Sequence, residues 1–154
     1  MIDTPQIVQV DSQRTAVIRL TVARHEMPLV MGPAMQEVID AVTAQDAGIA
    51  GPLFSHHFRL DPGLFDFEVG VPVERAVTPA GRVVPGELPA ATVARAIHTG
   101  PYEQLGEAWG ALMQWLAGAG HEPAPSLWER YLSGPESSPD PAQWRTELNR
   151  PLLQ

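Results

Sequence analysis

The chain has 154 residues, of which 44% are hydrophobic, so it is long and apolar enough to fold as one domain around a buried core and is not intrinsically disordered. Its ten basic residues, all arginine and scattered along the chain, stand against eighteen acidic ones, and this balance argues against direct nucleic-acid binding. The absence of cysteine excludes disulfides, thiolate metal sites and a thiol nucleophile.

The N-terminal sequence MIDTPQIVQV lacks the basic and then apolar pattern of a secretory signal. No apolar run approaches the roughly 18 residues that a membrane span needs. We therefore expect a soluble, cytoplasmic protein without membrane association.

The hydrophobic pattern predicts two successive strand–helix–strand–strand segments. After a short strand at 7–10, the first segment comprises a strand at 14–22, a helix at 33–46, and strands at 52–60 and 64–73. Residues 74–90, rich in proline and glycine, connect it to the second segment, with a strand at 91–99, a helix at 102–117, and strands at 126–132 and 143–149. Such a pattern is typical of an α+β domain with antiparallel strands.

The two segments look like copies of one unit. Residues 52–58 (PLFSHHF) align with 125–131 (PSLWERY), and 65–73 (FDFEVGVPV) align with 144–152 (WRTELNRPL). This alignment matches Phe54 with Leu127, His56 with Glu129, Phe58 with Tyr131, and Glu68 with Glu147. We therefore expect residues 1–154 to form one domain of two halves, about 5–73 and 91–152, with a ligand cleft where the halves meet.

A resemblance to a known family rests on the segments 65–73 (FDFEVGVPV), 98–102 (HTGPY), the following helix up to Gly120, 128–132 (WERYL) and 144–147 (WRTE). Their order and spacing resemble the GyrI-like small-molecule-binding domain of the SOUL/GyrI-like superfamily. That domain is also the effector-binding half of some multidrug-responsive transcription activators. The resemblance covers roughly residues 5–152.

The resemblance implies a pseudo-twofold pair of β-α-β-β units with two main helices and a central ligand cleft. In family members a glutamate on the strand after the second helix often meets the cation of an amphipathic aromatic drug, and that position falls at Glu129. Tyr102 and Tyr131 look like pocket aromatics, and Glu147 is similar to a second acidic residue. The activators carry a helix-turn-helix domain before this module, whereas only about a dozen residues precede the strand at 14–22, so a regulator role is not carried over.

The residues around Glu129 favour a binding role independently. Glu129 shares a strand face with Leu127 and Tyr131, where exclusion of water would strengthen its pairing with a ligand cation. With a raised pKa, the same carboxyl group would serve as a general base for water. The alternative is a surface salt bridge to an arginine.

Aromatic residues are expected to complete the site. Tyr102 and Tyr131, the two tyrosines of the chain, offer flat rings and hydroxyl groups, and aromatic faces attract cations. Phe54, His56 and Phe58 share a face and would line the other half of the cleft. For the two tyrosines and two phenylalanines, ordinary core packing is the alternative, and for His56 it is a partly buried, hydrogen-bonded side chain.

Glu68 and Glu147 are further pocket candidates, with a solvated sheet surface as the alternative. His56 and His57 are adjacent, so on a strand they point to opposite faces and cannot chelate one metal together. No spacing of His, Asp and Glu matches a metal site, and there is no Walker A, G-x-G-x-x-G or G-x-S-x-G motif. We expect neither a metal nor a cofactor.

These observations predict a stand-alone protein that binds hydrophobic, cationic aromatic small molecules, for drug or toxin binding or sensing. One alternative is a hydrolase of strained cyclopropane-type natural products, in which Glu129 activates water and Tyr131 assists, because some relatives of the family have this activity. Another alternative is a protein-interaction module of the gyrase-inhibitor type, with a protein partner.

Overall fold

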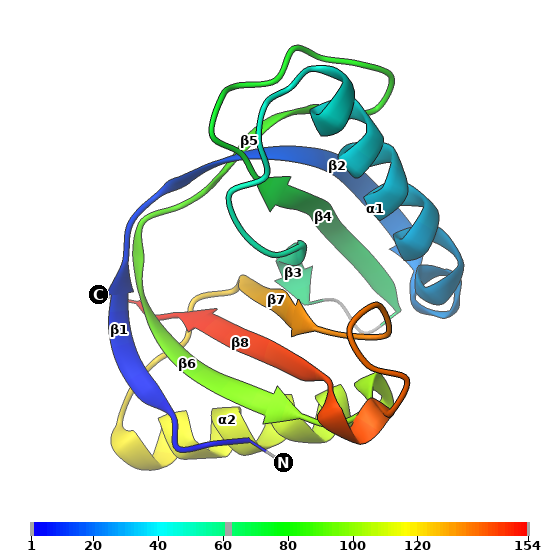
Figure 1. Ribbon diagram of the computed structural model, residues 1–154. Coiled ribbons are helices and arrows are strands. Elements are labelled where there is room, and N and C mark those ends of the chain that lie inside the picture. The colour runs from blue at the N-terminus through cyan, green and yellow to red at the C-terminus, as the bar shows by residue number, and fades with distance from the viewer. Residues whose placement is uncertain (1, 61–62, 154) are drawn as a thin grey trace. The chain divides into compact units, whose positions relative to one another are not determined.

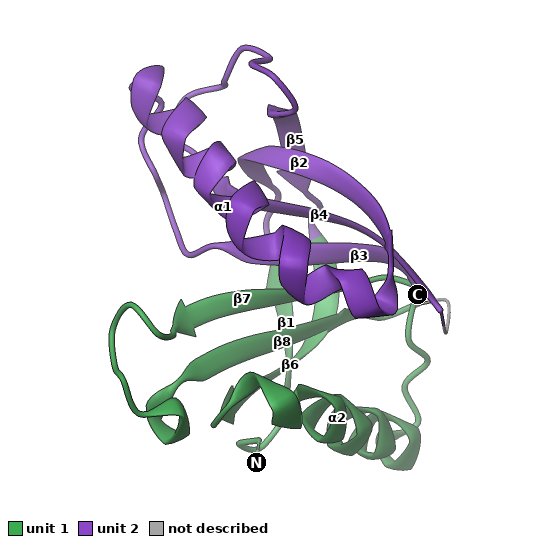
Figure 2. Cartoon of the chain, turned by 90° about the vertical axis from the view of Figure 1, so that its right-hand side faces the viewer, with its two compact units in different colours: residues 1–10, 91–154 green, residues 11–90 purple. Residues whose placement is uncertain are grey.

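Both predicted β-α-β-β segments are present, and the fold is α+β. The computed structural model describes residues 2–60 and 63–153. The chain divides into unit 1, formed by Met1–Val10 and Ala91–Gln154, and unit 2, formed by Asp11–Ala90 (Figure 2). Within the described residues, no helix combines the length and the apolarity needed to cross a membrane.

Unit 2 contains one long helix and antiparallel strands. In chain order these are β2 (Gln13–Ala23), the 3-10 turn η1 (Arg24–Glu26), α1 (Met27–Ala44), β3 (Phe54–Leu60), β4 (Leu64–Pro72) and β5 (Val84–Leu88). The strands lie in the order β5-β2-β4-β3. Val38 and Val42 of α1 pack with Ile18 of β2 and Phe67 and Val69 of β4 in one buried cluster, so α1 covers one face of these strands.

Unit 1 repeats this arrangement. Its elements are β1 (Gln6–Val10), β6 (Ala91–Thr99), the 3-10 turn η2 (Tyr102–Gln104), α2 (Leu105–Ala119), β7 (Leu127–Ser133), the 3-10 turn η3 (Pro141–Gln143) and β8 (Arg145–Pro151). The strands lie in the order β1-β6-β8-β7, all antiparallel (Figure 1). Leu112 and Leu116 of α2 pack with Ala96 and Leu148, and Gly120, at φ 78°, ends the helix in the left-handed conformation.

The duplication is therefore real at the level of topology. β2 pairs with β4, and β3 pairs with the other side of β4. In the same way, β6 pairs with β8, and β7 pairs with the other side of β8. Each unit also has one added edge strand, β5 beside β2 and β1 beside β6.

Several predicted boundaries are wrong. The first helix was expected to begin at residue 33, but α1 begins at Met27, because Pro28 suits a first helical turn and Pro33 is accommodated inside the helix. The strand β1 was expected in the first half, but it pairs with β6 and so belongs to unit 1. The segment 74–90 contains a strand, β5, and the last strand begins after Trp144.

The expected match of His56 with Glu129 is also wrong, by one residue. Glu68 and Glu147 do correspond, because each pairs with the middle strand at the same distance from a β-bulge. The partner of Glu68 is His56, whereas the partner of Glu147 is Arg130. Counting back one position, Ser55 therefore corresponds to Glu129, and His57 corresponds to Tyr131. A shift of one residue moves a side chain to the other face of a strand, so the correction changes which residues face the helices.

Candidate functional site

The side chain of Glu129 points from β7 toward α2. Its backbone pairs with Leu148, a member of the cluster packed on α2. The carboxylate Oε2 accepts a hydrogen bond of 2.6 Å from the indole Nε1 of Trp109, and Oε1 accepts one of 2.9 Å from the hydroxyl of Tyr131. The residue is 8% exposed. Two neutral donors therefore hold a buried carboxylate in a defined orientation, beside the buried Leu127 on the same strand face.

Burial raises the pKa of the Glu129 carboxyl group above its usual value, and the hydrogen bonds from Trp109 and Tyr131 and the charge of His98 counteract this. Within residues 2–60 and 63–153, no arginine forms an ion pair with Glu129. The carboxyl group is thus oriented by hydrogen bonds without a guanidinium partner, which is unusual for a buried acidic side chain.

Aromatic rings continue from Glu129 across unit 1. The Tyr102 ring meets the Tyr131 ring edge-on, with a centroid distance of 5.9 Å and an interplanar angle of 73°. On its other side it contacts Trp144, with centroids 4.9 Å apart. We call Tyr102, Trp109, Tyr131 and Trp144 the aromatic cluster; each of these side chains is half-buried.

The turn after β6 positions Tyr102. Gly100 adopts φ 139°, which L side chains rarely adopt, and an added Cβ there would lie 2.9 Å from Oε1 of Gln104. The ring Nε2 of His98 lies 3.3 Å from the carbonyl oxygen of Pro101. The HTGPY segment therefore reverses the chain sharply and places the tyrosine at the start of η2, close to β7.

Glu147 lies elsewhere. It follows Thr146 and precedes Leu148 on β8, so its side chain points away from α2. Its Oε1 accepts hydrogen bonds of 3.0 Å from Arg130 and from Asn149, and lies 3.4 Å from the guanidinium of Arg95. The structure does not bring Glu147 together with Glu129, and arginines offset its charge.

In unit 2, Phe54, His56 and Phe58 lie on β3. Glu68 lies on the neighbouring strand β4, where it pairs with His56. The His56 and Phe58 rings lie 4.5 Å apart, and the Arg19 guanidinium stands 4.3 Å from the centre of the Phe58 ring. Burial, and then the charge of Arg19, lowers the pKa of His56 to about 4, while burial raises the pKa of Glu68 against the influence of Arg19. Phe54 is buried. Ligand contact by these residues stays a prediction.

The position that corresponds to the Glu129–Tyr131 pair in unit 2 is occupied by Ser55 and His57. Ser55 Oγ lies 3.2 Å from His57 Nε2, and the His57 ring stacks on Phe67 at 5.0 Å. Burial lowers the pKa of His57 to about 4, with a further contribution from His56. The side chain is thus neutral at physiological pH, so only unit 1 carries a carboxylate at this position.

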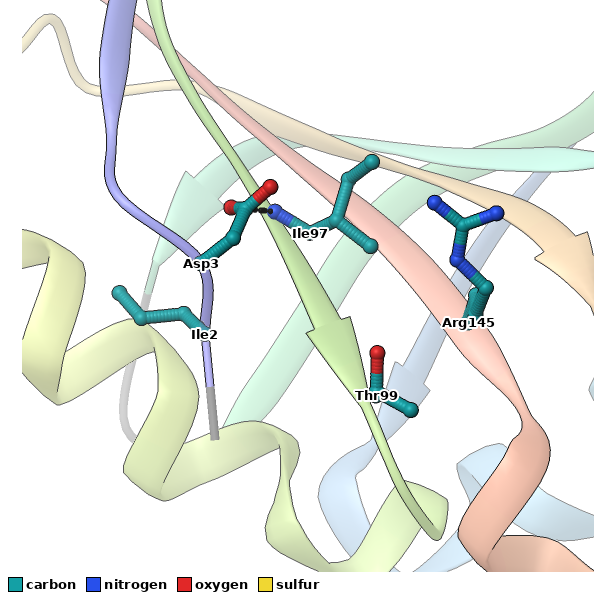
Figure 3. Close-up of a pocket in the computed structure, with 5 residues that line it drawn as sticks. All are labelled: Ile2, Asp3, Ile97, Thr99 and Arg145. Atoms are coloured by element: carbon teal, nitrogen blue, oxygen red, sulfur yellow. Dashed lines mark hydrogen bonds between the residues drawn. The ribbon is translucent and has the colours of Figure 1, made fainter.

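A separate hollow in unit 1 is bordered by the N-terminal segment, β6 and the start of β8. It has a volume of about 500 Å³ and is lined by Ile2, Asp3, Ile97, Thr99 and Arg145 (Figure 3). Asp3 is engaged there, since its Oδ1 accepts a hydrogen bond of 2.7 Å from the backbone N–H of Ile97. Glu129 is not among the residues that line this hollow.

Two members of the aromatic cluster were missed by sequence reasoning. Neither Trp109, on the predicted helix at 102–117, nor Trp144, in the segment 144–147, was among the candidate site residues. The available signal was that a half-buried indole N–H needs a hydrogen-bond acceptor, which Glu129 supplies for Trp109 and the carbonyl oxygen of Ser138 supplies for Trp144. Among the described residues, no group of three or more His, Asp or Glu side chains is placed to hold a metal ion.

Comparisons with solved structures identify the fold. The C-terminal domain of EcmrR superposes with a TM-score of 0.83 at 22% identity, covering 98% of both chains. The chain spans 57% of the EcmrR chain in a DNA complex, with a TM-score of 0.80. SAV2435 bound to tetraphenylphosphonium gives 0.66 at 10% identity, covering 98% of this chain and 94% of that one. A hydrolase from Listeria innocua gives 0.65 at 14% identity, covering 97% and 91%.

A search among curated protein sequences finds no match. The family model for the GyrI-like small molecule binding domain matches residues 3–152. Since that match covers nearly the whole chain, the protein belongs to the family of GyrI-like small-molecule-binding domains.

Proposed function

We propose that the aromatic cluster of unit 1 binds a hydrophobic organic cation, with Glu129 as its counter-charge. The observation that carries this proposal is a buried carboxylate whose two hydrogen-bond donors are both neutral. A buried ionised group of this kind is costly to the fold unless a cation pairs with it. A ligand cation would supply the missing charge.

The neighbouring rings suit the same ligand. Tyr102, Tyr131 and Trp144 are linked by ring contacts, and aromatic faces attract cations by about 0.5–2 kcal/mol each, depending on desolvation. Flat, apolar rings also favour a ligand with aromatic surface. Charge selection by Glu129 and shape selection by the rings therefore point to one ligand class.

The similarity to SAV2435, solved with tetraphenylphosphonium, supports a cationic ligand by analogy of fold. The C-terminal domain of EcmrR, a protein also solved in a complex with DNA, shares the fold, and we include a sensing role in the proposal on that analogy. A drug- or toxin-binding role, by sequestration or by sensing, is the biological function that we propose.

A matched pair of probes tests the charge requirement. N-methylphenylpyridinium is a permanent cation, and phenylpyridine is its neutral analogue at mildly alkaline pH. Isothermal titration calorimetry should show the cation binding at least about tenfold more tightly, which corresponds to about 1.4 kcal/mol. Equal affinities for the two probes would contradict the role of Glu129 as counter-charge.

Hydrolysis is a second candidate, favoured by the raised pKa of Glu129 next to the Tyr131 hydroxyl. The similarity to a hydrolase from Listeria innocua keeps this reaction class in view. Incubation with a strained cyclopropane-bearing electrophile, followed by chromatography, distinguishes the two functions. An enzyme consumes the compound over time with turnover, whereas a binding protein returns it unchanged.

A further inference from the structure

A second carboxylate stands next to the aromatic cluster, on the loop between β7 and β8. Glu136 lies in a turn that begins at Gly134. The Ser137 N–H donates to the carbonyl oxygen of Gly134 at 2.9 Å, and the Ser137 hydroxyl both donates to that oxygen and accepts from the Gly134 N–H. The turn is thus closed by its own hydrogen bonds, and these restrict the position of Glu136.

This turn is packed against Tyr102. A Cβ added to the buried Gly134 would lie 2.5 Å from the Tyr102 hydroxyl oxygen and 3.1 Å from Oε2 of Glu136. The hydroxyl and the Glu136 carboxylate therefore flank the same small volume. The loop is further tied to the cluster because Trp144 donates from Nε1 to the carbonyl oxygen of Ser138 at 2.9 Å.

Electrostatics agree with this geometry. Burial raises the pKa of Tyr102, and the charges of Glu136 and Glu129 both add to the effect. The Tyr102 hydroxyl is thus influenced by the charges of two carboxylates, the buried Glu129 and the exposed Glu136. Glu136 is exposed, and no arginine of the described segments forms an ion pair with it.

We infer that Glu136 is a specificity-determining residue that selects ligands with two positive charges, one paired with Glu129 within the aromatic cluster and the other with Glu136 at its edge. The inference rests on the proposed function of Glu129. The ligand class becomes a flat aromatic dication, with the outer carboxylate discriminating it from a monocation of the same shape. Exposure of Glu136 makes its contribution smaller than that of Glu129 and more sensitive to salt.

Two nearly isosteric probes separate these contributions: methyl viologen, a dication, and N-methylphenylpyridinium, a monocation. Affinities are measured by calorimetry for the wild type, Glu129→Gln, Glu136→Gln and Glu103→Gln. Glu103 is the matched control, because it is an exposed carboxylate next to Tyr102 in sequence that does not contribute to the shift of the tyrosine pKa. Thermal melting of each variant checks that the fold is intact.

Glu136→Gln should weaken methyl viologen binding about fivefold and change the monocation by less than about twofold, while Glu129→Gln weakens both probes by about tenfold or more. Glu103→Gln should leave both affinities within about twofold. Equal loss for the two probes in Glu136→Gln, or no loss for methyl viologen, overturns the inference and leaves the role of Glu129 standing. Failure of both probes to bind the wild type, or insensitivity of both to Glu129→Gln, overturns the proposed function and the inference with it.

Discussion

Replacing Glu129 by glutamine removes one charge and almost no volume. The glutamine carbonyl oxygen can accept from Trp109 Nε1, and its amide group can donate to the Tyr131 hydroxyl, which accepts as well as donates. Both hydrogen bonds of the site can therefore be kept. The substitution isolates the charge of Glu129 from its packing.

Loss of that charge should weaken binding of a hydrophobic cation such as tetraphenylphosphonium by about 2 kcal/mol, or about thirtyfold in Kd. Folding should respond in the opposite sense. Because Glu129 is buried without an arginine partner, its ionised form opposes folding, and the variant should be as stable as the wild type or more stable at neutral pH.

The pH dependence follows from the raised pKa of Glu129. The folded protein holds the proton more tightly than the unfolded chain, in which the pKa is near 4.5, so the stability contributed by the protonated group is complete below that value. This contribution to stability is lost as the pH rises through the pKa that Glu129 has in the folded protein. Cation binding changes in the reverse direction, since it requires the carboxylate and strengthens as the pH rises through the same range.

Calorimetric titrations across this pH range, with wild type and Glu129→Gln side by side, test the reasoning. The wild type should gain affinity as the pH rises, and the variant should bind weakly at every pH. Glu103→Gln controls for the loss of one acidic residue from the surface of unit 1. A variant that binds the cation as tightly as the wild type would refute the counter-charge role.

Three further predictions concern the stability of the fold. Gly134→Ala should destabilise the protein by about 1–3 kcal/mol in thermal melting, because its Cβ would lie 2.5 Å from the Tyr102 hydroxyl; an unchanged melting temperature would be inconsistent with this packing. Leu112→Ala should cost about 2–5 kcal/mol in urea unfolding because the side chain is fully buried against β6 and β8, whereas Leu29→Ala, at a residue that is 75% exposed, should cost under about 0.5 kcal/mol. Folding lowers the pKa of His57 from 6.5 to about 4, so the free energy of unfolding should fall by roughly 3 kcal/mol as the pH falls through that interval. Urea unfolding of His57→Phe should lack this pH dependence.

Periodicity and composition were sufficient to predict the order of the helices and strands apart from β5. The α2 stripe of Leu105, Trp109, Leu112 and Leu116 has helical spacing and is the face that packs on the strands, and Gly120 ends the helix as expected. The predicted helix began six residues too late, at residue 33, which is a proline and would itself suit a first helical turn. Pro28 already occupies the first turn, and local propensity does not reveal which of two prolines a helix will accommodate in its interior.

The register between the copies could not be obtained from similarity of residues alone. Matching PLFSHHF with PSLWERY aligned the leading prolines and the aromatics, and it paired His56 with Glu129. The ladder shows the match shifted by one residue, with Ser55 as the counterpart of Glu129. Side chains alternate along a strand, so an error of one position exchanges the two faces. It is the β-bulges, at His57/Arg59 and Tyr131/Ser133, that define the correspondence.

The sequence by itself determined that the chain is an α+β duplication and that Glu129 shares a strand face with Tyr131, because periodicity is a local property. Only the tertiary structure showed that Trp109 and Tyr131 orient this carboxylate, that arginines offset Glu147 on the other face, and that Glu136 adjoins Tyr102. These relations join residues on different elements. Their physical basis is the packing of α2 and the β7–β8 loop against the strands, which sets the burial and the charge partners of each group. The local sequence pattern does not encode this packing.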